Sequence, residues 1–284
     1  MTQSGAPGLT VLGTTAGSGK SLYVRSFASL RRRAGHEVSV YKPVALALNP
    51  VRDDAQVDRS IHLMGIAATG EAIAAERILG YTATVNGDDV TLRRAGERSA
   101  SAQSRRLSED AVDFMRLDDD QWSEIKGQVA TDVAARTGFL LSEGAGAATD
   151  VTARDLSNTV LASMADRPVV LVAAGRKGGW AASVVGTYHL LPAVVRSKVR
   201  GFVVNGVEQS DAAASAVHQV EASTGWQCLG VVPIIPMYAQ LPARGSEEPI
   251  LGSWSEEITA VADFVASHLD EDFLKEFTSR GDDV

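Results

Sequence analysis

The stretch GTTAGSGKS, at residues 13–21, lies between segments of different periodicity. Before it, LTVLGT at 9–14 is a short apolar run, which is typical of a buried strand. After it, residues 20–34 have the periodicity of a helix that Gly35 ends, and HEVSVYKPV at 36–44 is typical of a second strand. A strand, a glycine-rich loop, a helix and a second strand in this order predict a parallel βαβ crossover.

The loop itself predicts a nucleoside triphosphate site. Consecutive backbone N–H groups in such a loop, together with the N-terminus of the following helix, attract phosphate. The common motif G-x-x-x-x-G-K-[ST] would assign the phosphate-binding lysine to Lys20 and the Mg²⁺-binding hydroxyl to Ser21. Counting back from Gly19, however, puts Thr14 at the first position, and the glycine lies one residue earlier, at Gly13. The alternative is a glycine turn that contains Gly-Lys-Ser by chance.

Further apolar runs extend the pattern and lie at 139–146, 167–175, 199–206 and 228–236. Helices fit between them at 152–165, 180–195 and 211–224. Because these strands are continuously apolar rather than alternating, we expect both faces of the sheet to be covered. The sequence therefore predicts one α/β domain over 1–284 with a doubly wound, mostly parallel sheet. Ligands of such a sheet bind at the carboxyl ends of its strands.

Some regions fit this pattern less well. Residues 84–109 contain the turn signal Asn86-Gly87 and few core residues, so we expect a hairpin or an excursion there. Residues 253–277 are acidic and amphipathic, and we expect one or two helices. We expect the triplet Arg31-Arg32-Arg33 at a solvated helix end, where cations suit the helix dipole.

Composition narrows the classes of partner. The formal net charge of −8 disfavours nucleic acids and anionic membranes. No apolar run approaches the roughly 20 residues that span a bilayer, and we expect no signal peptide because the N-terminus lacks a basic segment followed by an apolar one. Cys228 is the one cysteine, which excludes an internal disulfide and suits a reducing cytoplasm. We expect a soluble cytoplasmic protein in which Cys228 is a buried strand residue rather than a nucleophile.

Polar residues lie at the ends of several predicted strands. Lys42 either offsets charge on a transferred phosphoryl group or is a surface lysine whose stem covers apolar neighbours. Glu143 ends a buried run, where a carboxylate is costly unless it is paired or binds a metal, so a Mg²⁺ ligand is favoured over a helix cap. Asn205 ends GFVVN, where its amide either pairs with a purine edge or forms a turn.

The motifs GTxxxxGKS, YKPV, EGAG, RDLSN, GFVVN and LGVVP occur in this order along the chain. The series resembles the ATP-binding, amide-forming domain of cobyric acid synthase and, more distantly, dethiobiotin synthetase. The resemblance covers about residues 9–243 and is most specific over 139–207. Both families place the loop glycine one residue early, as at Gly13. The resemblance implies the P-loop NTPase-like fold of dethiobiotin synthetase.

In this family ATP phosphorylates a substrate carboxylate or carbamate, and the acyl phosphate is then attacked. The resemblance therefore implies ATP and Mg²⁺ as cofactors and a small-molecule carboxylate as substrate. It places Asn205 and the backbone near Pro233 against adenine. The loop residues that it implies in ATP binding are Gly13, Thr14, Thr15, Gly17, Ser18, Gly19, Lys20 and Ser21.

The resemblance also implies a metal site. Ser21 and Glu143 would ligate Mg²⁺ together with an acidic residue that follows the second strand, for which Asp54 is our candidate. The rivals for Asp54 are Asp53, Asp58 and, in a second alignment, Gln56.

A substrate pocket is implied beside the metal. RDLSN at 154–158 matches the family segment Arg-Asp-Ile-Ala-Asn, which lies near the active site. We expect Lys42, Asp155 and Lys177 to bound this pocket and to share catalysis with Lys20.

Other features depart from the family. The loop has Ala16-Gly17 where the family often has Ser-Asp. The family segment Asp-Ile-Asp-Arg-Gly-Gly appears as AGRKGG at 174–179, which removes two carboxylates and predicts a more anionic substrate or a changed metal position. Cobyric acid synthase also carries a glutamine-splitting domain, and this sequence ends before it. We therefore expect ammonia to come from solution or from a separate glutaminase subunit.

These features favour a stand-alone ATP-dependent ligase that activates a carboxylate for attack by ammonia or an amine. The first alternative is carboxylation with ring closure, as in dethiobiotin synthetase. A regulatory or partitioning ATPase has a similar sheet, but such proteins carry a lysine where this loop has Thr15. A scaffold that binds nucleotide without turnover is a further alternative, favoured by the lost acids. A homodimer is implied only by analogy with dethiobiotin synthetase.

Overall fold

A computed structural model describes most of the chain. The described residues are 7–46, 50–51, 54–86, 89–97, 100–106, 112–113, 117–150, 154–176, 178–236 and 254–279. Within them, no helix combines the length and the apolar character that a bilayer crossing requires.

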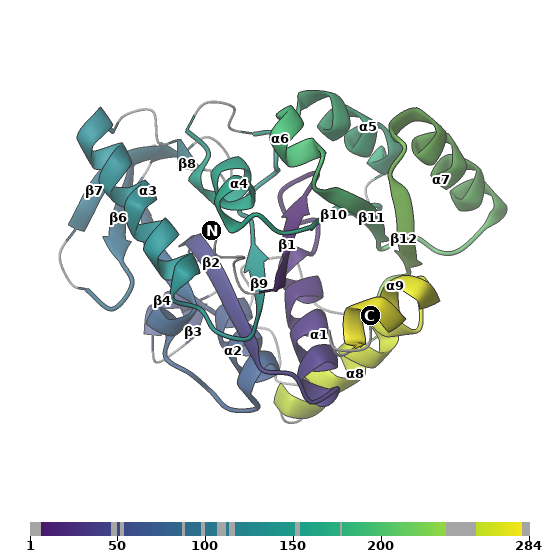
Figure 1. Ribbon diagram of the computed structural model, residues 1–284, viewed down its shortest axis with the longest axis horizontal. Coiled ribbons are helices and arrows are strands. Elements are labelled where there is room, and N and C mark those ends of the chain that lie inside the picture. Colours follow the sequence, from purple (N-terminus) through teal and green to yellow (C-terminus); the bar gives the residue numbers. More distant parts are fainter. Residues whose placement is uncertain are drawn as a thin grey trace, which may run out of the picture.

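The centre of the fold is a ten-stranded sheet in the order β12-β11-β10-β1-β9-β2-β5-β6-β7-β8 (Figure 1). From β12 to β5 all neighbours are parallel, and from β5 to β8 they are antiparallel. The parallel strands are β1 (Gly8–Gly13), β2 (Val38–Leu46), β5 (Leu79–Asn86), β9 (Phe139–Glu143), β10 (Val169–Ala174), β11 (Val199–Asn205) and β12 (Gln227–Val232). The predicted mostly parallel, P-loop NTPase-like sheet is confirmed. β5 was not predicted.

The antiparallel extension consists of β6 (Asp89–Arg94), β7 (Ala100–Arg106) and β8 (Val112–Asp113). β5 and β6 pair from Tyr81 with Arg94 to Asn86 with Asp89. A separate pair, β3 (Pro50–Val51) and β4 (Asp54–Asp58), precedes α2.

Helices cover both faces of the sheet (Figure 1). One face packs against α1 (Lys20–Arg33), α2 (Arg59–Thr69), α8 (Trp254–Ala266) and α9 (Glu271–Thr278). The other packs against α3 (Asp119–Ala134), α4 (Leu161–Ala165), α5 (Trp180–Leu190), α6 (Ala193–Arg196) and α7 (Asp211–Thr224). Alternate residues of one strand join different cores, because side chains alternate across a strand: Val11 contributes to the α1 side and Leu12 to the α5 side.

The arginine triplet at the end of α1 was expected to be solvated, and it is so only in part: Arg33 is exposed, Arg32 is half-buried and Arg31 is buried. Arg31 is buried, donates to the Phe277 carbonyl, and has its guanidinium 3.9 Å from the centroid of the Phe139 ring. Arg32 donates to a carbonyl of α2, and Arg33 pairs with a carboxylate of α8. The expectation was wrong for Arg31. Each arginine attaches a different helix to α1, and only the packing of α2, α8 and α9 determines these contacts.

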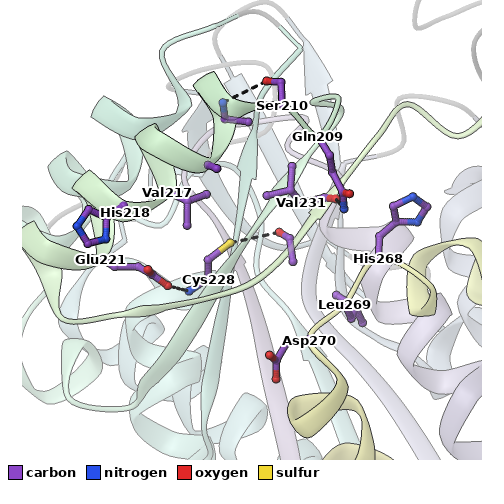
Figure 2. A pocket seen from close by; sticks show the side chains of 13 residues that line it. Gln209, Ser210, Val217, His218, Glu221, Cys228, Val231, His268, Leu269 and Asp270 are labelled. Atoms are coloured by element: carbon purple, nitrogen blue, oxygen red, sulfur yellow. Dashed lines mark hydrogen bonds between the residues drawn. The ribbon is translucent and has the colours of Figure 1, made fainter.

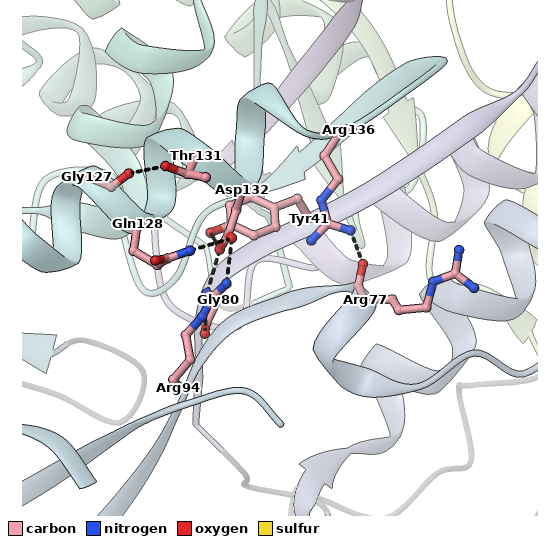
Figure 3. Close-up of polar contacts among 9 residues, drawn as sticks. All are labelled: Tyr41, Arg77, Gly80, Arg94, Gly127, Gln128, Thr131, Asp132 and Arg136. Carbon is pink, nitrogen blue, oxygen red and sulfur yellow. Dashed lines mark hydrogen bonds and ion pairs between the residues drawn. The ribbon is translucent and has the colours of Figure 1, made fainter. Parts of the chain in front are cut away.

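A buried polar cluster connects the antiparallel extension to the parallel sheet (Figure 3). Arg94 of β6 donates twice to Asp132 of α3, at 2.6 and 2.5 Å. The Tyr41 hydroxyl of β2 donates to the same carboxylate at 3.0 Å. Burial, and then the neighbouring Asp132, raise the pKa of Tyr41 well above its usual value. The cluster holds α3, β2 and β6 together next to Lys42.

Candidate functional site

The glycine-rich loop connects β1 to α1 as predicted. Gly17 and Gly19 have φ values of 67° and 103°, in the left-handed region that favours glycine. A Cβ added at Gly13 would lie 2.4 Å from Ser18 Oγ and 3.0 Å from Lys20 Nζ. The early glycine is therefore explained by a close approach of the loop to its own first residue.

Two side chains from distant elements support this loop. Asn205, at the end of β11, donates from Nδ2 to the Ser18 carbonyl at 2.9 Å. The Thr14 hydroxyl lies 2.9 Å from that of Ser183 on α5. An amide nitrogen has two hydrogens, so Asn205 keeps one for a further acceptor. Its contact with adenine stays a prediction. Ser183 was not predicted, because no local motif marks a contact across 169 residues.

Glu143 is the centre of the site. Its Oε1 accepts from Ser21 Oγ at 2.7 Å and pairs with Lys42 Nζ at 2.6 Å. The Glu143 side chain is only 1% exposed. Its second oxygen, Oε2, is buried and makes no hydrogen bond to the described part of the chain. The sheet places these groups together because β9 lies between β1 and β2.

This oxygen-rich arrangement fits a magnesium ion. Mg²⁺ prefers oxygen ligands, keeps several waters, and is usually bound by one or two carboxylates together with substrate phosphates. Glu143 Oε2, which makes no hydrogen bond to the described part of the chain, and the Ser21 hydroxyl are oxygen ligands of this kind. No group of three or more His, Cys, Asp or Glu side chains that could hold a metal occurs among the described residues. The side chain of Asp54, the third predicted ligand, lies outside the described part.

Lys20 opens α1 and is buried beneath the loop. Its Nζ donates to the Gly146 carbonyl at 2.7 Å. Gly146 belongs to the segment that follows β9, so Lys20, which is predicted to bind phosphate, and the Glu143 segment are directly connected. No local pattern predicts this contact across 126 residues.

Comparison with known protein families shows the family to which this chain belongs. The model of the AAA domain family matches residues 7–240. This chain belongs to the AAA domain family. Membership, together with the glycine-rich loop, assigns it a P-loop, ATP-dependent role.

Curated relatives of this AAA domain chain include cobyric acid synthases. A probable cobyric acid synthase of Archaeoglobus fulgidus is 30% identical over 238 residues, which are 81% of this chain and 49% of the relative. The cobyric acid synthase of Brucella melitensis biotype 2 is 30% identical over 261 residues, 88% of this chain and 51% of the relative. The resemblance to this family is thus confirmed, and the chain spans about half the length of these relatives.

Solved structures that are similar to this chain have low sequence identity to it. MinD of Aquifex aeolicus is 12% identical, with a TM-score of 0.44 over 93% of this chain and 99% of that chain. The signal recognition particle receptor FtsY of Elizabethkingia anophelis is 11% identical, with a TM-score of 0.42 over 92% of this chain and 66% of that chain.

Of the other predicted site residues of the AAA domain chain, Asp155 and Pro233 lie in the described part and Lys177 does not. Asp155 is 2% exposed and accepts hydrogen bonds from the backbone of Asn158 and Thr159. Burial raises the pKa of Asp155 to about 6, against the lowering effect of these hydrogen bonds. Pro233 follows β12, next to the loop after β11. Lys177 lies outside the described residues. The catalytic roles of Asp155 and Lys177 stay predictions.

Cys228 lies on β12, at the edge of the sheet and away from the strand ends that carry the loop. It lines a pocket of about 490 Å³ between α7, β12 and the segment that connects α8 to α9 (Figure 2). Burial raises the pKa of this thiol to about 11, although a hydrogen bond with the Gly230 backbone lowers it. A thiol of this pKa is protonated at neutral pH, which disfavours a nucleophilic role.

We therefore expect slow alkylation of Cys228. At pH 8 the thiolate fraction of a group with a pKa of about 11 is roughly 0.1%. The rate with iodoacetamide should be about 100-fold below that of free cysteine, and it should rise about tenfold for each pH unit up to pH 10. Mass spectrometry of timed samples measures it, and urea-unfolded protein is the control. Alkylation of the folded protein as fast as that of the unfolded control would contradict a protonated thiol.

Proposed function

We propose that the protein is an ATP-dependent C–N ligase that activates a substrate carboxylate by phosphorylation for attack by ammonia or an amine. The observation that carries the proposal is the convergence of Ser21 and Lys42 on the buried Glu143, beside the loop that contains Lys20. A site built this way presents cations and oxygen ligands to a triphosphate, and phosphoryl transfer depends chiefly on positioning and electrostatics. The similarity to cobyric acid synthases supports the same chemistry.

The reaction has two steps. An oxygen of the substrate carboxylate attacks the γ-phosphorus, the bond to the oxygen that bridges the β- and γ-phosphates breaks, and ADP leaves. Ammonia or an amine then attacks the acyl carbon, inorganic phosphate leaves, and the nitrogen loses a proton to give the amide. Water would compete with the amine, so the site must exclude it.

The chain's own residues bind and orient the reactants. The loop amides and Lys20 hold the phosphates, and Lys42 offsets negative charge on the transferred phosphoryl group. Asn205 orients the loop and contacts adenine. Ser21, Glu143 and Asp54 would hold Mg²⁺, which when bound neutralises phosphate charge.

The substrate class follows from two departures from the family within the sequence. Ala174 and Arg176 stand where the family has carboxylates. Less negative charge and an added cation favour a more anionic substrate than that of cobyric acid synthases. A separate glutaminase subunit that supplies ammonia is a proposed partner. A homodimer is a further proposal, by analogy alone.

ADP release under defined co-substrates tests the proposal. Purified protein with Mg-ATP is given a panel of carboxylates, including small dicarboxylates and corrinoid acids, with and without ammonium chloride. We expect ADP release that requires both a carboxylate and ammonia, and a new amide detected by mass spectrometry. ADP release that requires bicarbonate and a diamine instead would establish the carboxylating alternative. ATP binding without turnover in every arm, unchanged by Lys20→Ala, would establish the non-catalytic one.

A further inference from the structure

The loop after β9 is held at both ends by the strand that leads into the nucleotide loop. Gly144 N donates to the Val11 carbonyl at 3.0 Å, and Ala148 N donates to the Gly13 carbonyl at 2.8 Å. Residues 144–148 therefore follow any movement of β1 closely. Between these two anchors, the direction of each carbonyl depends on contacts from elsewhere.

Asn158 supplies those contacts. Its Nδ2 donates to the carbonyls of Ala145 and Ala147, at 2.8 and 3.3 Å. Its Oδ1 packs so close to Gly144 that a Cβ there would lie 2.2 Å away. Asn158 is 2% exposed, so solvent cannot replace these hydrogen bonds, and the glycine is required for the amide to approach.

Asp155 orients Asn158. Its Oδ1 accepts from Asn158 N at 3.0 Å and from Asn158 Nδ2 at 3.2 Å, and its Oδ2 accepts from Thr159 N at 3.1 Å. These bonds cap the short π-helix Leu156–Val160 and restrict the Asn158 side chain. Three acceptors surround Nδ2, which identifies it as the nitrogen of the amide.

We propose that Asn158, oriented by Asp155, is a positioning residue for Lys20. With the carbonyls of Ala145 and Ala147 turned to Asn158, that of Gly146 between them accepts from Lys20 Nζ at 2.7 Å. An ammonium has three donors, so Lys20 keeps this bond while it donates to phosphates. The nucleotide then meets a lysine whose conformation is already restricted, and binding costs less entropy. The inference rests on the proposed function only in that Lys20 binds triphosphate.

The decisive measurement compares the affinity of the protein for ATP with its affinity for AMP. The P-loop lysine reaches the β- and γ-phosphates, which AMP lacks. We expect Asn158→Ala to weaken ATP binding about tenfold, the size of one hydrogen bond to a charged group, and to leave AMP binding within about twofold. Asn158→Leu keeps the branched shape of the side chain but removes the donor and adds no charge beside Asp155, so it should behave like Asn158→Ala and serves if that variant does not fold. Competition against a fluorescent ATP analogue gives both affinities.

The control is Thr159→Val on the same π-helix, where the hydroxyl donates to the Asp155 carbonyl rather than to the 144–147 loop. It should leave the ratio of ATP to AMP affinity unchanged. Equal weakening of ATP and AMP by Asn158→Ala, or no weakening of either, would overturn the proposal. A crystal structure of the unaltered protein needs no variant: Lys20 Nζ beyond hydrogen-bond reach of the Gly146 carbonyl, with and without an ATP analogue, would also overturn it. Protein that binds ATP with this ratio but forms no amide refutes only the ligase reaction.

Discussion

Replacement of Glu143 by glutamine should reduce the turnover of ATP by roughly two to three orders of magnitude, the size reported for loss of one preorganised electrostatic contact. The substitution keeps the shape of the side chain but removes its charge. It leaves the Lys42 ammonium without the carboxylate that now lies 2.6 Å away, and it replaces the anionic oxygen available to Mg²⁺. The magnesium concentration that gives half-maximal turnover should therefore rise as well. Steady-state ADP release over a magnesium titration measures both effects.

The matched control for this variant is Ser142→Ala on the same strand. Ser142 is fully buried, its hydroxyl has no hydrogen-bond partner in the described part of the chain, and adjacent strand side chains point to opposite faces. Loss of an unpaired hydroxyl is nearly neutral, so turnover and stability should stay close to wild type. If Glu143→Gln retained turnover within about threefold of wild type, Glu143 would have no part in phosphoryl transfer.

Replacement of Asp132 by alanine should lower the free energy of unfolding by about 3 kcal/mol, because it removes the carboxylate that pairs with a largely buried guanidinium. Arg94 would lose two charge-assisted hydrogen bonds, and the buried Tyr41 hydroxyl would lose its acceptor. The value lies at the low end for a broken buried pair, since the Arg94 side chain is 21% exposed. Urea unfolding followed by circular dichroism measures the difference.

Two further variants separate the ion pair from general packing. Gln128 donates to the same carboxylate at 3.2 Å, and Gln128→Ala should cost at most about 1 kcal/mol. The triple variant Tyr41→Phe, Arg94→Met, Asp132→Leu replaces the cluster by apolar groups of similar volume and should recover most of the loss. A cost below about 1 kcal/mol for Asp132→Ala alone would show that solvent reaches Arg94 more freely than its packing indicates.

Much of the fold could be predicted from local patterns. The βαβ unit that contains the nucleotide loop follows from short-range periodicity and from the glycine that stops α1. The later parallel strands β9 to β12 are largely apolar runs, so coverage of both sheet faces was also predictable. β5 was missed because Gly80 and two threonines interrupt its apolar character, and its place between β2 and β6 depends on pairing rather than on pattern.

For the candidate site, the residues could be predicted from the sequence, but the contacts between them could not. Lys20 and Ser21 follow from the motif, and Glu143 and Asn205 follow from their positions at strand ends. Lys42 was expected at the end of the second strand, but it lies in the middle of β2, because that strand continues to Leu46. The connections among these residues do not follow, because Ser21 and Lys42 lie 122 and 101 residues from the carboxylate that they share. The Lys20 contact with Gly146 and the support of that loop by Asn158 likewise depend on segments that meet only in the folded chain.

The sequence by itself determined the fold class, the nucleotide loop with its early glycine, and the types of residue at the strand ends, because these depend on periodicity and on the steric needs of neighbouring residues. Only the tertiary structure decided why that glycine is early, since Ser18 and Lys20 pack against it. It also decided that Glu143 joins Ser21 to Lys42, and that the arginines ending α1 are attachments to other helices. These outcomes depend on the order of strands and the packing of helices, which bring distant residues within hydrogen-bond distance.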